Sequence, residues 1–510
     1  MFCFKIYLDM KKKLFLLAIL AVALFVGQNV KAQDTVFSHT HQGTTLYYFI
    51  DNSGNATLVP PLYPNIDTVN DEMWTGYTKP QGAVVIPDSV PYGGSNHAVT
   101  RVGYCAFFRC YDVTSVTMPS TLRAIGKHGF LYCSSLTSPV VPEGVTTIGF
   151  GAFDKCTSMQ TITLPSTLTS IGDYAFYKCY SLQSVTLPVG LTSIGYAAFY
   201  ESGLTEVVLP EGLKSLGIFA FSDCGALQSV KLPSTLDAIG GACFQGDTSL
   251  VSVIIPEGVD TIHQWAFFGC ASLPTVTLPV TLKYIGRDAF AYCTSLDSVY
   301  CPDSIRYIGP VAFYYCTNLA IVRLPEQLEQ VNGWLLYGTA LREVVVPSKV
   351  TFIDTAAFSA CQQLHKVILP ASLTTLAEYI FVNGTHLDTI ILLSSVPPSA
   401  YDNDFTEFTA TLIVPCGAVE AYRQHSVWGR FANIVENCDG INEADADNLR
   451  IYSRDGRIIV EGAEGEIVQV FDVAGRLAQS FRNSSNRVLS TGVYIVKVGN
   501  RPARRVIVTD

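Results

Sequence analysis

Apolar residues recur along this chain at fixed positions of a 23-residue unit, from Met118 to about Leu392. In the copy LPSTLTSIGDYAFYKCYSLQSVT, which starts at Leu164, the apolar and polar residues alternate toward the next proline. This alternation indicates a short strand with one buried face. A fixed period of this length is typical of a solenoid, in which each coil packs only against its neighbours. Successive prolines are 23 residues apart, except for two steps of 22. They are Pro119, Pro142, Pro165, Pro188, Pro210, Pro233, Pro256, Pro279, Pro302, Pro325, Pro347 and Pro370.

One coil can be divided into segments from its residue pattern. Leu182, Val185 and Leu187 are expected to point inward, whereas Ser184 and Thr186 point outward. Proline then ends the strand because it has no N–H for the ladder, and stacked coils build one long parallel sheet. A glycine follows, such as Gly195, and we expect it to adopt a backbone conformation that other residues avoid.

An aromatic residue recurs eleven residues after the proline, and only Leu336 interrupts the series. Stacked rings at one repeat position predict a buried spine, and a row of ligand-binding rings is the weaker interpretation. A second aromatic set lies beside this one. We expect it to pack between coils rather than to stack on sugars, and it comprises Tyr177, Tyr200, Phe268, Tyr314 and Tyr337.

The repeated phrase resembles the BspA-type leucine-rich repeat of bacterial surface proteins of the Bacteroidetes. The resemblance implies a mainly β solenoid, a right-handed superhelix of about 12–13 coils of 23 residues with a parallel sheet and short helical turns. Residues 101–392 form the repeats in this scheme. Residues 33–100 resemble the N-terminal β cap of such proteins, which shields the open edge of the first coil.

The N-terminus has the pattern of a secretory signal peptide. Three lysines, Lys11 to Lys13, precede an apolar run from Leu14 to Val26 that is shorter than a membrane span. We predict a signal peptide over residues 1–32, with cleavage between Ala32 and Gln33. The protein is then secreted or located at the outer cell surface.

The chain has 15 cysteines, and most of them follow the repeat. Equivalent positions in neighbouring coils are close enough for a bridge, but parallel Cα–Cβ vectors disfavour the torsion of a disulfide. We therefore predict a ladder of buried free thiols that act as small apolar residues. Cys416 and Cys438 lie outside the ladder and flank one compact segment, so a disulfide between them is favoured.

The period is lost after the repeats. Residues 393–438 resemble the terminal cap of such solenoids, with a short helix over Glu420–Gln424 and Trp428 covering the core. Residues 439–448 form an acidic linker. Residues 449–510 show alternating strands and hairpin turns, which predict a small β-sandwich that resembles the sorting domain of type IX secretion. The alternative is an accessory sandwich without a sorting role.

The outward strand positions change character along the chain. Early coils carry Ser and Thr there, whereas later coils carry Tyr300, Arg323, Glu343 and Lys366. Such side chains resemble the hot spots of protein interfaces, so these four are the predicted ligand-binding residues. The alternative is ordinary solvated decoration of the strands.

Candidate chemistry is sparse. We find no sequence motif for catalytic, cofactor-binding or metal-binding residues, which argues against an enzyme. A net charge of −10 argues against nucleic acid as a partner. The predicted function is adhesion or ligand binding by a monomer, with a host matrix protein or another bacterium implied by the resemblance, and with secretion machinery engaged by the tail. The alternatives are a glycan-binding protein of a nutrient-uptake system and a structural spacer of the envelope.

Overall fold

A computed structural model describes residues 36–63 and 71–438, together with strand segments between residues 450 and 508. The predicted signal peptide, with its cleavage site at Ala32 and Gln33, lies outside the described residues, and so does the linker 439–448. The chain divides into two compact units, Met1–Leu296 and Asp297–Asp510.

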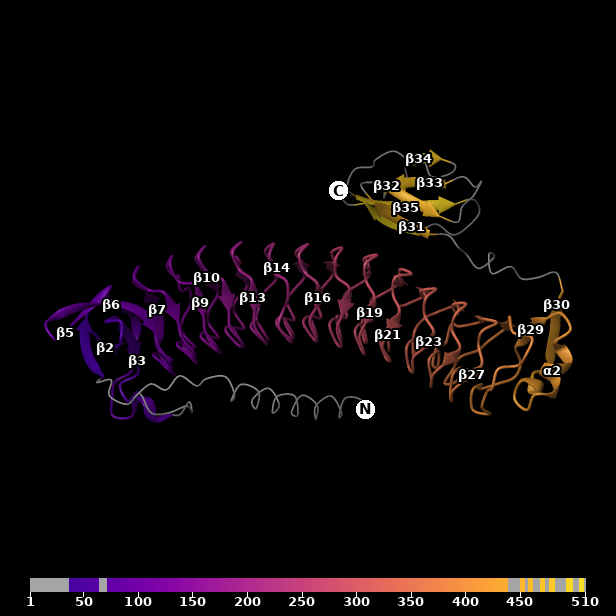
Figure 1. Cartoon of the computed structure of the whole chain (residues 1–510), viewed down its shortest axis with the longest axis horizontal. Coiled ribbons are helices and arrows are strands. Elements are labelled where there is room, and N and C mark those ends of the chain that lie inside the picture. Colours follow the sequence, from indigo (N-terminus) through magenta and orange to yellow (C-terminus); the bar gives the residue numbers. More distant parts are fainter. Residues whose placement is uncertain are drawn as a thin grey trace. The chain divides into compact units, whose positions relative to one another are not determined.

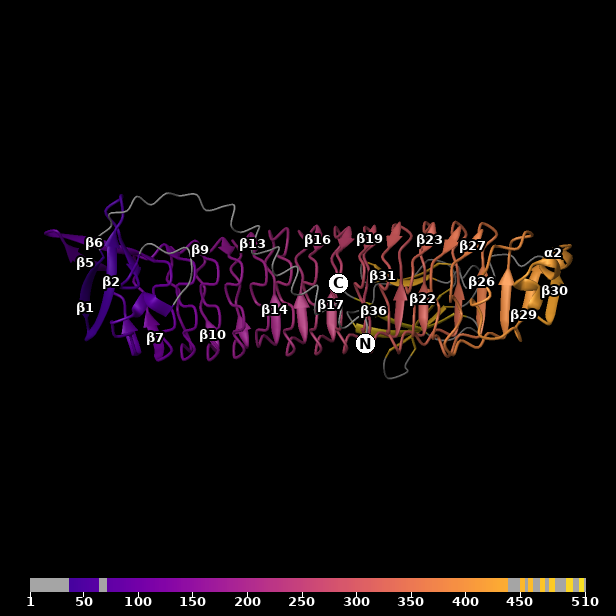
Figure 2. The same cartoon turned by 90° about the horizontal axis from the view of Figure 1, so that it is seen from below.

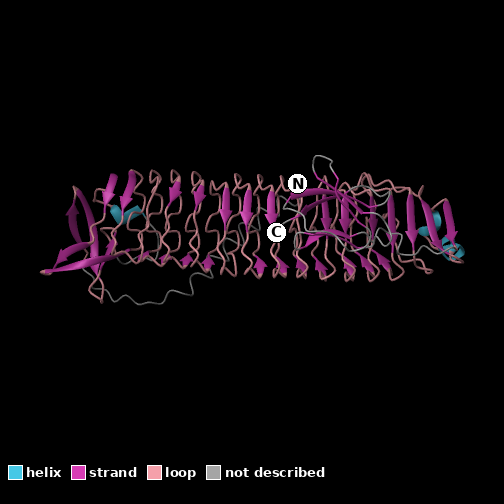
Figure 3. Ribbon diagram, turned by 90° about the horizontal axis from the view of Figure 1, so that it is seen from above, coloured by secondary structure: helices cyan, strands magenta, loops and turns pink. Residues whose placement is uncertain are grey.

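The first unit is a stack of coils, each with up to two short strands on opposite sides (Figures 1 and 3). One row of parallel strands contains the segments before the prolines: β4 (Gly82–Val85), β7 (Val113–Thr117), β10 (Thr161–Ile162), β12 (Ser184–Val185), β14 (Glu206–Val208), β15 (Ser229–Lys231) and β17 (Ser252–Ile254). The second row comprises β3 (Ala56–Val59), β6 (Ser95–Val102), β8 (Ala124–Ile125), β9 (Thr147–Ile148), β11 (Ser170–Ile171), β13 (Ser193–Ile194), β16 (Ala238–Ile239), β18 (Thr261–Ile262) and β19 (Tyr284–Ile285). The pattern of apolar and polar residues predicts only the first row of strands.

The second unit has the same arrangement. Its proline-side row holds β20 (Ser298–Tyr300), β22 (Ile321–Arg323), β24 (Glu343–Val345), β26 (Lys366–Leu369), β28 (Thr389–Leu392), β29 (Thr411–Pro415) and β30 (Asn433–Asn437), and β22, β26 and β29 are visible in Figure 2. Its other row holds β21 (Tyr307–Ile308), β23 (Gln330–Val331), β25 (Phe352–Ile353) and β27 (Thr375–Leu376).

The strand spacing continues beyond the recognisable repeats, contrary to the expectation that it is lost after residue 392. β28, β29 and β30 pair in parallel, with Thr389 opposite Thr411 and Thr411 opposite Asn433, a step of 22 residues each time. The two units together contain about 15 coils, more than the 12–13 predicted. The sequence pattern does not predict the additional coils, because they keep the strand but lack the repeated proline and Ala-Phe motif. Leucine-rich-repeat architecture itself is confirmed.

Each unit has further elements beyond its coils. In the first unit, β1 (Phe37–His41), β2 (Thr44–Ile50) and β3 form an antiparallel meander, β5 (Ser89–Tyr92) pairs with β6, and η1 (Asp71–Trp74) follows β3 in the sequence. In the second unit, α2 (Val419–Gln424) and η2 (Trp428–Arg430) precede β30. Trp428 is fully buried, contacts Phe405 edge-on, and donates its indole N–H to the carbonyl of Pro398 at 2.8 Å. It covers the end of the core as expected.

The C-terminal tail contains antiparallel strands in two sheets. One sheet pairs β31 (Arg450–Arg454) with β32 (Arg457–Glu461). The other sheet has the strand order β34 (Leu477–Phe481), β33 (Val468–Asp472), β35 (Gly492–Val498) and β36 (Arg504–Val508).

The recurring phenylalanine forms the spine of the interior, as the sequence predicts. In the first unit the rings from Phe107 to Phe290 are buried and stack nearly parallel, with centroids 4.9 Å apart at Phe107–Phe130 and 5.8 Å apart at Phe221–Phe244. In the second unit Phe358, Phe381 and Phe405 continue this pattern at 5.8 and 5.5 Å. Each buried ring stabilises the fold by roughly 1.5–3 kcal/mol from burial, and ring–ring contact adds about 0.5–1.5 kcal/mol.

The segment around each spine ring is a pair of tight turns. Tyr174 and Lys178, on either side of Phe176, both have φ near +57°. The backbone N–H groups of Tyr174, Phe176 and Lys178 donate to carbonyls of the next coil at 2.7–2.8 Å. The sequence predicts short helical turns here. Left-handed residues on both sides of the ring prevent a continuous helix and direct alternate N–H groups to the neighbouring coil instead.

The repeat glycine is required for space. The backbone at Gly195 does not take a positive φ, contrary to expectation. A Cβ at the equivalent Gly172 would lie 2.8 Å from the carbonyl carbon of Gly149 and 2.9 Å from the nitrogen of Phe150. The glycine therefore allows two coils to approach backbone to backbone.

The predicted thiol ladder is present. The ladder cysteines are free and buried, and the thiol of Cys156 donates to the carbonyl of Phe130 at 3.3 Å, one coil away. Cys133 and Cys179 repeat this contact at 3.2 Å. Burial raises the pKa of Cys156 well above its usual value, so the group remains an inert thiol.

Asp247 replaces the ladder cysteine in one coil. It is fully buried, and its Oδ1 accepts the N–H of Cys224 at 2.8 Å, while Oδ2 has no partner. Burial raises the pKa of the Asp247 carboxyl well above its usual range. The folded protein therefore holds this carboxyl in its neutral form.

We predict that Gly172→Ala destabilises the first unit by about 1–3 kcal/mol, because the added methyl overlaps the backbone of the previous coil. Gly190→Ala is the matched control, since a Cβ there would lie 3.6 Å from its nearest neighbour, the carbonyl oxygen of Ser166. Chemical denaturation followed by circular dichroism measures both. Equal stability of the two variants would contradict the account of close approach.

We predict that Asp247→Asn stabilises the protein more at pH 7 than at pH 4. The carboxyl ionises near pH 4 in the unfolded chain but stays protonated well above that pH in the folded protein. Wild-type stability therefore falls as the pH rises from about 4 toward the folded pKa, by about 1.4 kcal/mol per pH unit. Denaturant unfolding of both proteins across this range tests the trend, and a difference independent of pH would refute it.

Candidate functional site

The predicted binding residues lie on the outward strand positions of the second unit, which we call the strand face: Ser298, Tyr300, Ile321, Arg323, Glu343, Val345 and Lys366. Tyr300 is in register with Arg323, and Glu343 is in register with Lys366. The first pair stands two residues before the coil proline and the second pair stands four residues before it. The four residues therefore form two adjacent pairs in different rows of one face.

Ion pairs occupy the charged members of this face. Lys366 Nζ lies 3.4 Å from Glu343 Oε2, and Arg323 Nη2 lies 3.1 Å from Oδ1 of Asp303, in the turn after β20. Both pairs are partly solvated, so each stabilises the fold by at most about 1 kcal/mol. They hold the side chains in place beside the apolar residues.

Apolar side chains share this face with the ion pairs. Tyr300, Ile321 and Val345 come from β20, β22 and β24 and are 42, 46 and 41% exposed. We call these three residues the apolar patch. The sequence had singled out Tyr300 but not its two aliphatic neighbours as binding residues. Ile368, expected to point outward in the same row, is buried.

The early coils also carry apolar residues at outward strand positions, contrary to the prediction of Ser and Thr alone. Val140, Val208 and Ile254 occupy the outward position of their coils in the first unit and are exposed. They are spread among polar neighbours such as Thr163 and Lys231 rather than placed on consecutive coils. They therefore do not form a patch like that of the second unit.

The side of the coils that flanks the spine, which we call the turn face, carries the second aromatic set. In the first unit Tyr177 and Tyr200 are half-buried and stack at 5.1 Å, which supports the packing interpretation. Lysines are placed among these rings: Lys155 Nζ lies 4.5 Å from the ring centroid of Tyr132, and Lys178 Nζ lies 5.3 Å from that of Tyr177. Burial raises the pKa of the nearby Asp154 to about 7.

The negative net charge of the chain does not reveal this local group of basic side chains. Arg109, Lys155 and Lys178 share one repeat position, two residues after the spine ring, and can be found by aligning the coils. Their cations already lie over aromatic rings, and Lys178 also pairs with Glu201 at 3.3 Å. These contacts stabilise the packing between coils.

Phe268, also in the first unit, is half-buried and contacts Tyr292 edge-on at 5.3 Å between ring centroids. The turn face of the second unit carries the other two members of the predicted set, Tyr314 and Tyr337, which stack at 5.2 Å. Trp334 lies 4.9 Å from Tyr337 between ring centroids, and Tyr315 lies 5.5 Å from it. Trp334 and Tyr315 are 40 and 37% exposed, and neither was a candidate from the sequence.

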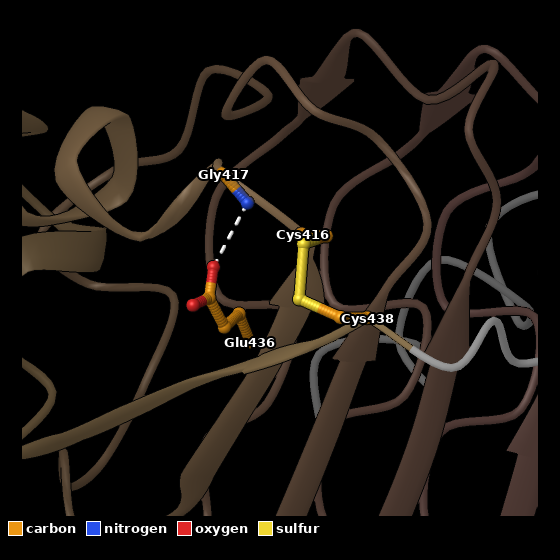
Figure 4. The surroundings of a disulfide bond; sticks show 4 residues. All are labelled: Cys416, Gly417, Glu436 and Cys438. Atoms are coloured by element: carbon orange, nitrogen blue, oxygen red, sulfur yellow. Dashed lines mark hydrogen bonds between the residues drawn. A yellow bond between two sulfur atoms is a disulfide. The ribbon is translucent and has the colours of Figure 1, made fainter.

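Cys416 and Cys438 are joined in a disulfide that links the residue after β29 to the residue after β30 (Figure 4). The Glu436 carboxylate accepts the N–H of Gly417 at 2.9 Å beside it. In the described part of the chain, Cys416, Glu436 and Cys438 form the one cluster of three side chains whose metal-ligating atoms lie close together. Its two sulfurs are bonded to each other and offer no thiolate to an ion.

The repeats assign the chain to a family. The model of the BspA type Leucine rich repeat region matches residues 95–202, 169–297 and 283–406, which together span more than half of the 510 residues. The chain belongs to the BspA-type leucine-rich-repeat family. No curated protein matches it.

Solved structures are similar to this BspA-type chain. A leucine-rich repeat protein from Bacteroides ovatus has 23% identity and a TM-score of 0.54, over 80% of this chain and 100% of its own. A leucine rich cell surface protein from Faecalibacterium prausnitzii has 24% identity and a TM-score of 0.41, with coverages of 71 and 96%. The pneumococcal vaccine antigen PcpA has 17% identity and a TM-score of 0.42, with coverages of 80 and 100%. The first of these similarities supports the fold of the BspA-type repeats.

Within the described residues, no helix has both the length and the apolar character needed to cross a bilayer.

Proposed function

We propose that this protein is an exported cell-surface protein that binds a protein ligand through the strand face of its second unit. The apolar patch of Tyr300, Ile321 and Val345 carries the proposal, because exposed apolar residues on consecutive coils have no role in packing the interior. Protein interfaces commonly have an apolar centre enclosed by polar groups.

The rim of the patch supports a protein as ligand. The Arg323–Asp303 and Glu343–Lys366 pairs stand beside the apolar side chains and are partly solvated. Rim charges of this kind govern the rate and specificity of association more than its affinity. The side chains project from a hydrogen-bonded sheet, so little conformational entropy is lost when a ligand binds.

Cell-surface location belongs to the same proposal. It is favoured by membership of the BspA-type family and by the basic and apolar N-terminal segment, for which we propose cleavage between Ala32 and Gln33. The antiparallel strands of the tail agree with the proposed sandwich, which would engage type IX secretion machinery. The resemblance to BspA-type proteins favours a host matrix protein or another bacterium as the partner.

We predict that Tyr300→Thr combined with Ile321→Ser weakens binding to a matrix protein by about 2 kcal/mol or more for each residue that acts as an anchor. Thr and Ser occupy these strand positions in early coils, such as Thr186 and Ser184, so the unfolding free energy should change by less than about 1 kcal/mol. Surface plasmon resonance against fibronectin, laminin and collagen gives the affinities. Val208→Thr, at the same strand position in the first unit, is the control. Binding to none of these proteins, or equal affinities of the double variant and the control, would refute the proposal.

We predict that deletion of residues 449–510 leaves the solenoid folded, because each coil is stabilised by its neighbours. In a host with type IX machinery the truncated protein should accumulate in the periplasm, whereas the full chain reaches the surface. Fractionation with antibody detection measures this, and the full chain in a host without the machinery is the control. Normal surface display of the truncated protein would show that the tail has no sorting role and is an accessory domain.

A further inference from the structure

The coil over residues 330–339 departs most from the repeat. Leu336 replaces the spine ring and Thr339 replaces the ladder cysteine, yet both are buried. The Thr339 hydroxyl donates to the carbonyl of Leu336 at 2.9 Å. The interior of this coil is therefore filled and hydrogen-bonded by other residues, and its unusual feature lies on the outside.

That feature is a cluster of four aromatic rings on the turn face, Tyr314, Tyr315, Trp334 and Tyr337, which we call the aromatic cluster. Tyr314 and Tyr315 come from one coil, and Trp334 and Tyr337 come from the next. Ring centroids are 4.7 Å apart for Tyr314–Tyr315, 4.9 Å for Trp334–Tyr337 and 6.2 Å for Tyr314–Trp334. The outer members, Trp334 and Tyr315, remain more than a third exposed.

The fold does not require an indole at this position. Trp334 has a φ of 60°, a conformation that is unfavourable for a bulky residue. Ala356, at the same repeat position one coil later, adopts nearly the same φ of 55° with a single methyl group. The backbone conformation is therefore independent of the ring, and the exposed indole adds apolar surface in contact with water.

We propose that the aromatic cluster binds the pyranose rings of a neutral glycan chain. The C–H groups on one face of a pyranose carry partial positive charge, which complements the negative face of an aromatic ring. Sugar hydroxyls need polar partners at the edges of such a platform. The phenols of Tyr315 and Tyr337 hydrogen-bond each other, and each phenol oxygen can accept a further hydrogen bond from a sugar hydroxyl. This site lies apart from the strand face and does not depend on the function proposed for it.

The next coil leaves space beside the platform. Ala356 and Ala360 occupy the repeat positions of Trp334 and Gly338, so the side chains at these two positions are small. One coil further, the Asn383 amide donates to the Ser359 hydroxyl at 3.2 Å, and Asn383 also hydrogen-bonds Tyr337. A chain of sugars lying along the coils would meet the aromatic cluster first, and then the exposed Tyr379 ring and Asn383 side chain, so that both apolar and polar groups would face it.

The lysine-lined rings of the first unit do not offer the same surface. There Lys155 and Lys178 lie over Tyr177, so cations of the chain itself occupy the ring faces. Trp265 occupies the repeat position of Trp334, but its indole is hydrogen-bonded to Asp288. Trp265 is therefore the matched control residue for Trp334.

The test applies the purified full-length protein to an array of neutral and acidic glycans. The bound neutral glycans are then titrated into the wild type and every variant by isothermal titration calorimetry, with tryptophan fluorescence as a second readout for the wild type. Trp74 and Trp428 are buried, so a sugar that stacks on Trp334 alters the emission of an exposed indole. Trp334→Ala should weaken binding by about tenfold or more, since one stacked ring is lost. Trp334→Phe should retain most of the affinity because it keeps an aromatic face.

Trp265→Ala should leave the affinity unchanged, and thermal unfolding should confirm that Trp334→Ala folds like the wild type. Three outcomes would overturn the proposal: no neutral glycan bound on the array, equal affinity of Trp334→Ala and wild type, or equal losses in Trp334→Ala and Trp265→Ala. A protein ligand that requires Trp334 while no neutral glycan binds would assign the cluster to protein recognition instead.

Discussion

Contact between equivalent residues of neighbouring coils is the interaction on which the structure of each unit depends. The spine ring stacks on the ring of the next coil, the thiol of Cys156 reaches the carbonyl of Phe130, and the N–H of Phe176 reaches the carbonyl of Ala198. Each contact repeats because the same residue type returns after 22 or 23 positions. A coil alone could not bury its ring or satisfy its backbone, so stability comes from adjacent coils together. The close approach at the repeat glycine keeps this spacing short.

The same constraint determines where function can be located. The interior of the described coils is filled mainly by rings, aliphatic side chains and thiols, and burial raises the pKa of thiols such as Cys133 and Cys156, so these thiols are poor nucleophiles. Side chains that are free to vary lie on the strand face and the turn face, where a change affects few contacts between coils. Tyr300 and Trp334 occupy such positions, and the hydrogen-bonded coils hold them in place. A rigid surface of this kind suits binding, which agrees with a BspA-type protein.

Periodicity predicted the interior because the repeat position of a residue determines its neighbours. It placed Phe176 in a spine and Cys156 among buried thiols. It misjudged Gly195, because sequence does not distinguish a glycine needed for its φ from one needed for close approach. It could not give the ion pair of Arg323, since Asp303 belongs to another part of the preceding coil. Trp334 was missed because residue type at its position varies widely, and only the side chain's exposure singles it out.

Chemical modification of the cysteines tests the closed, stacked interior most directly. Twelve free cysteines are buried in the described residues, and Cys416 and Cys438 are bridged. Native protein treated with iodoacetamide and analysed by peptide mass spectrometry should carry no label at the twelve positions, and all twelve should react after denaturation. The account also predicts one disulfide, between Cys416 and Cys438. Labelling of the ladder cysteines in folded protein, or disulfides between neighbouring coils, would contradict it.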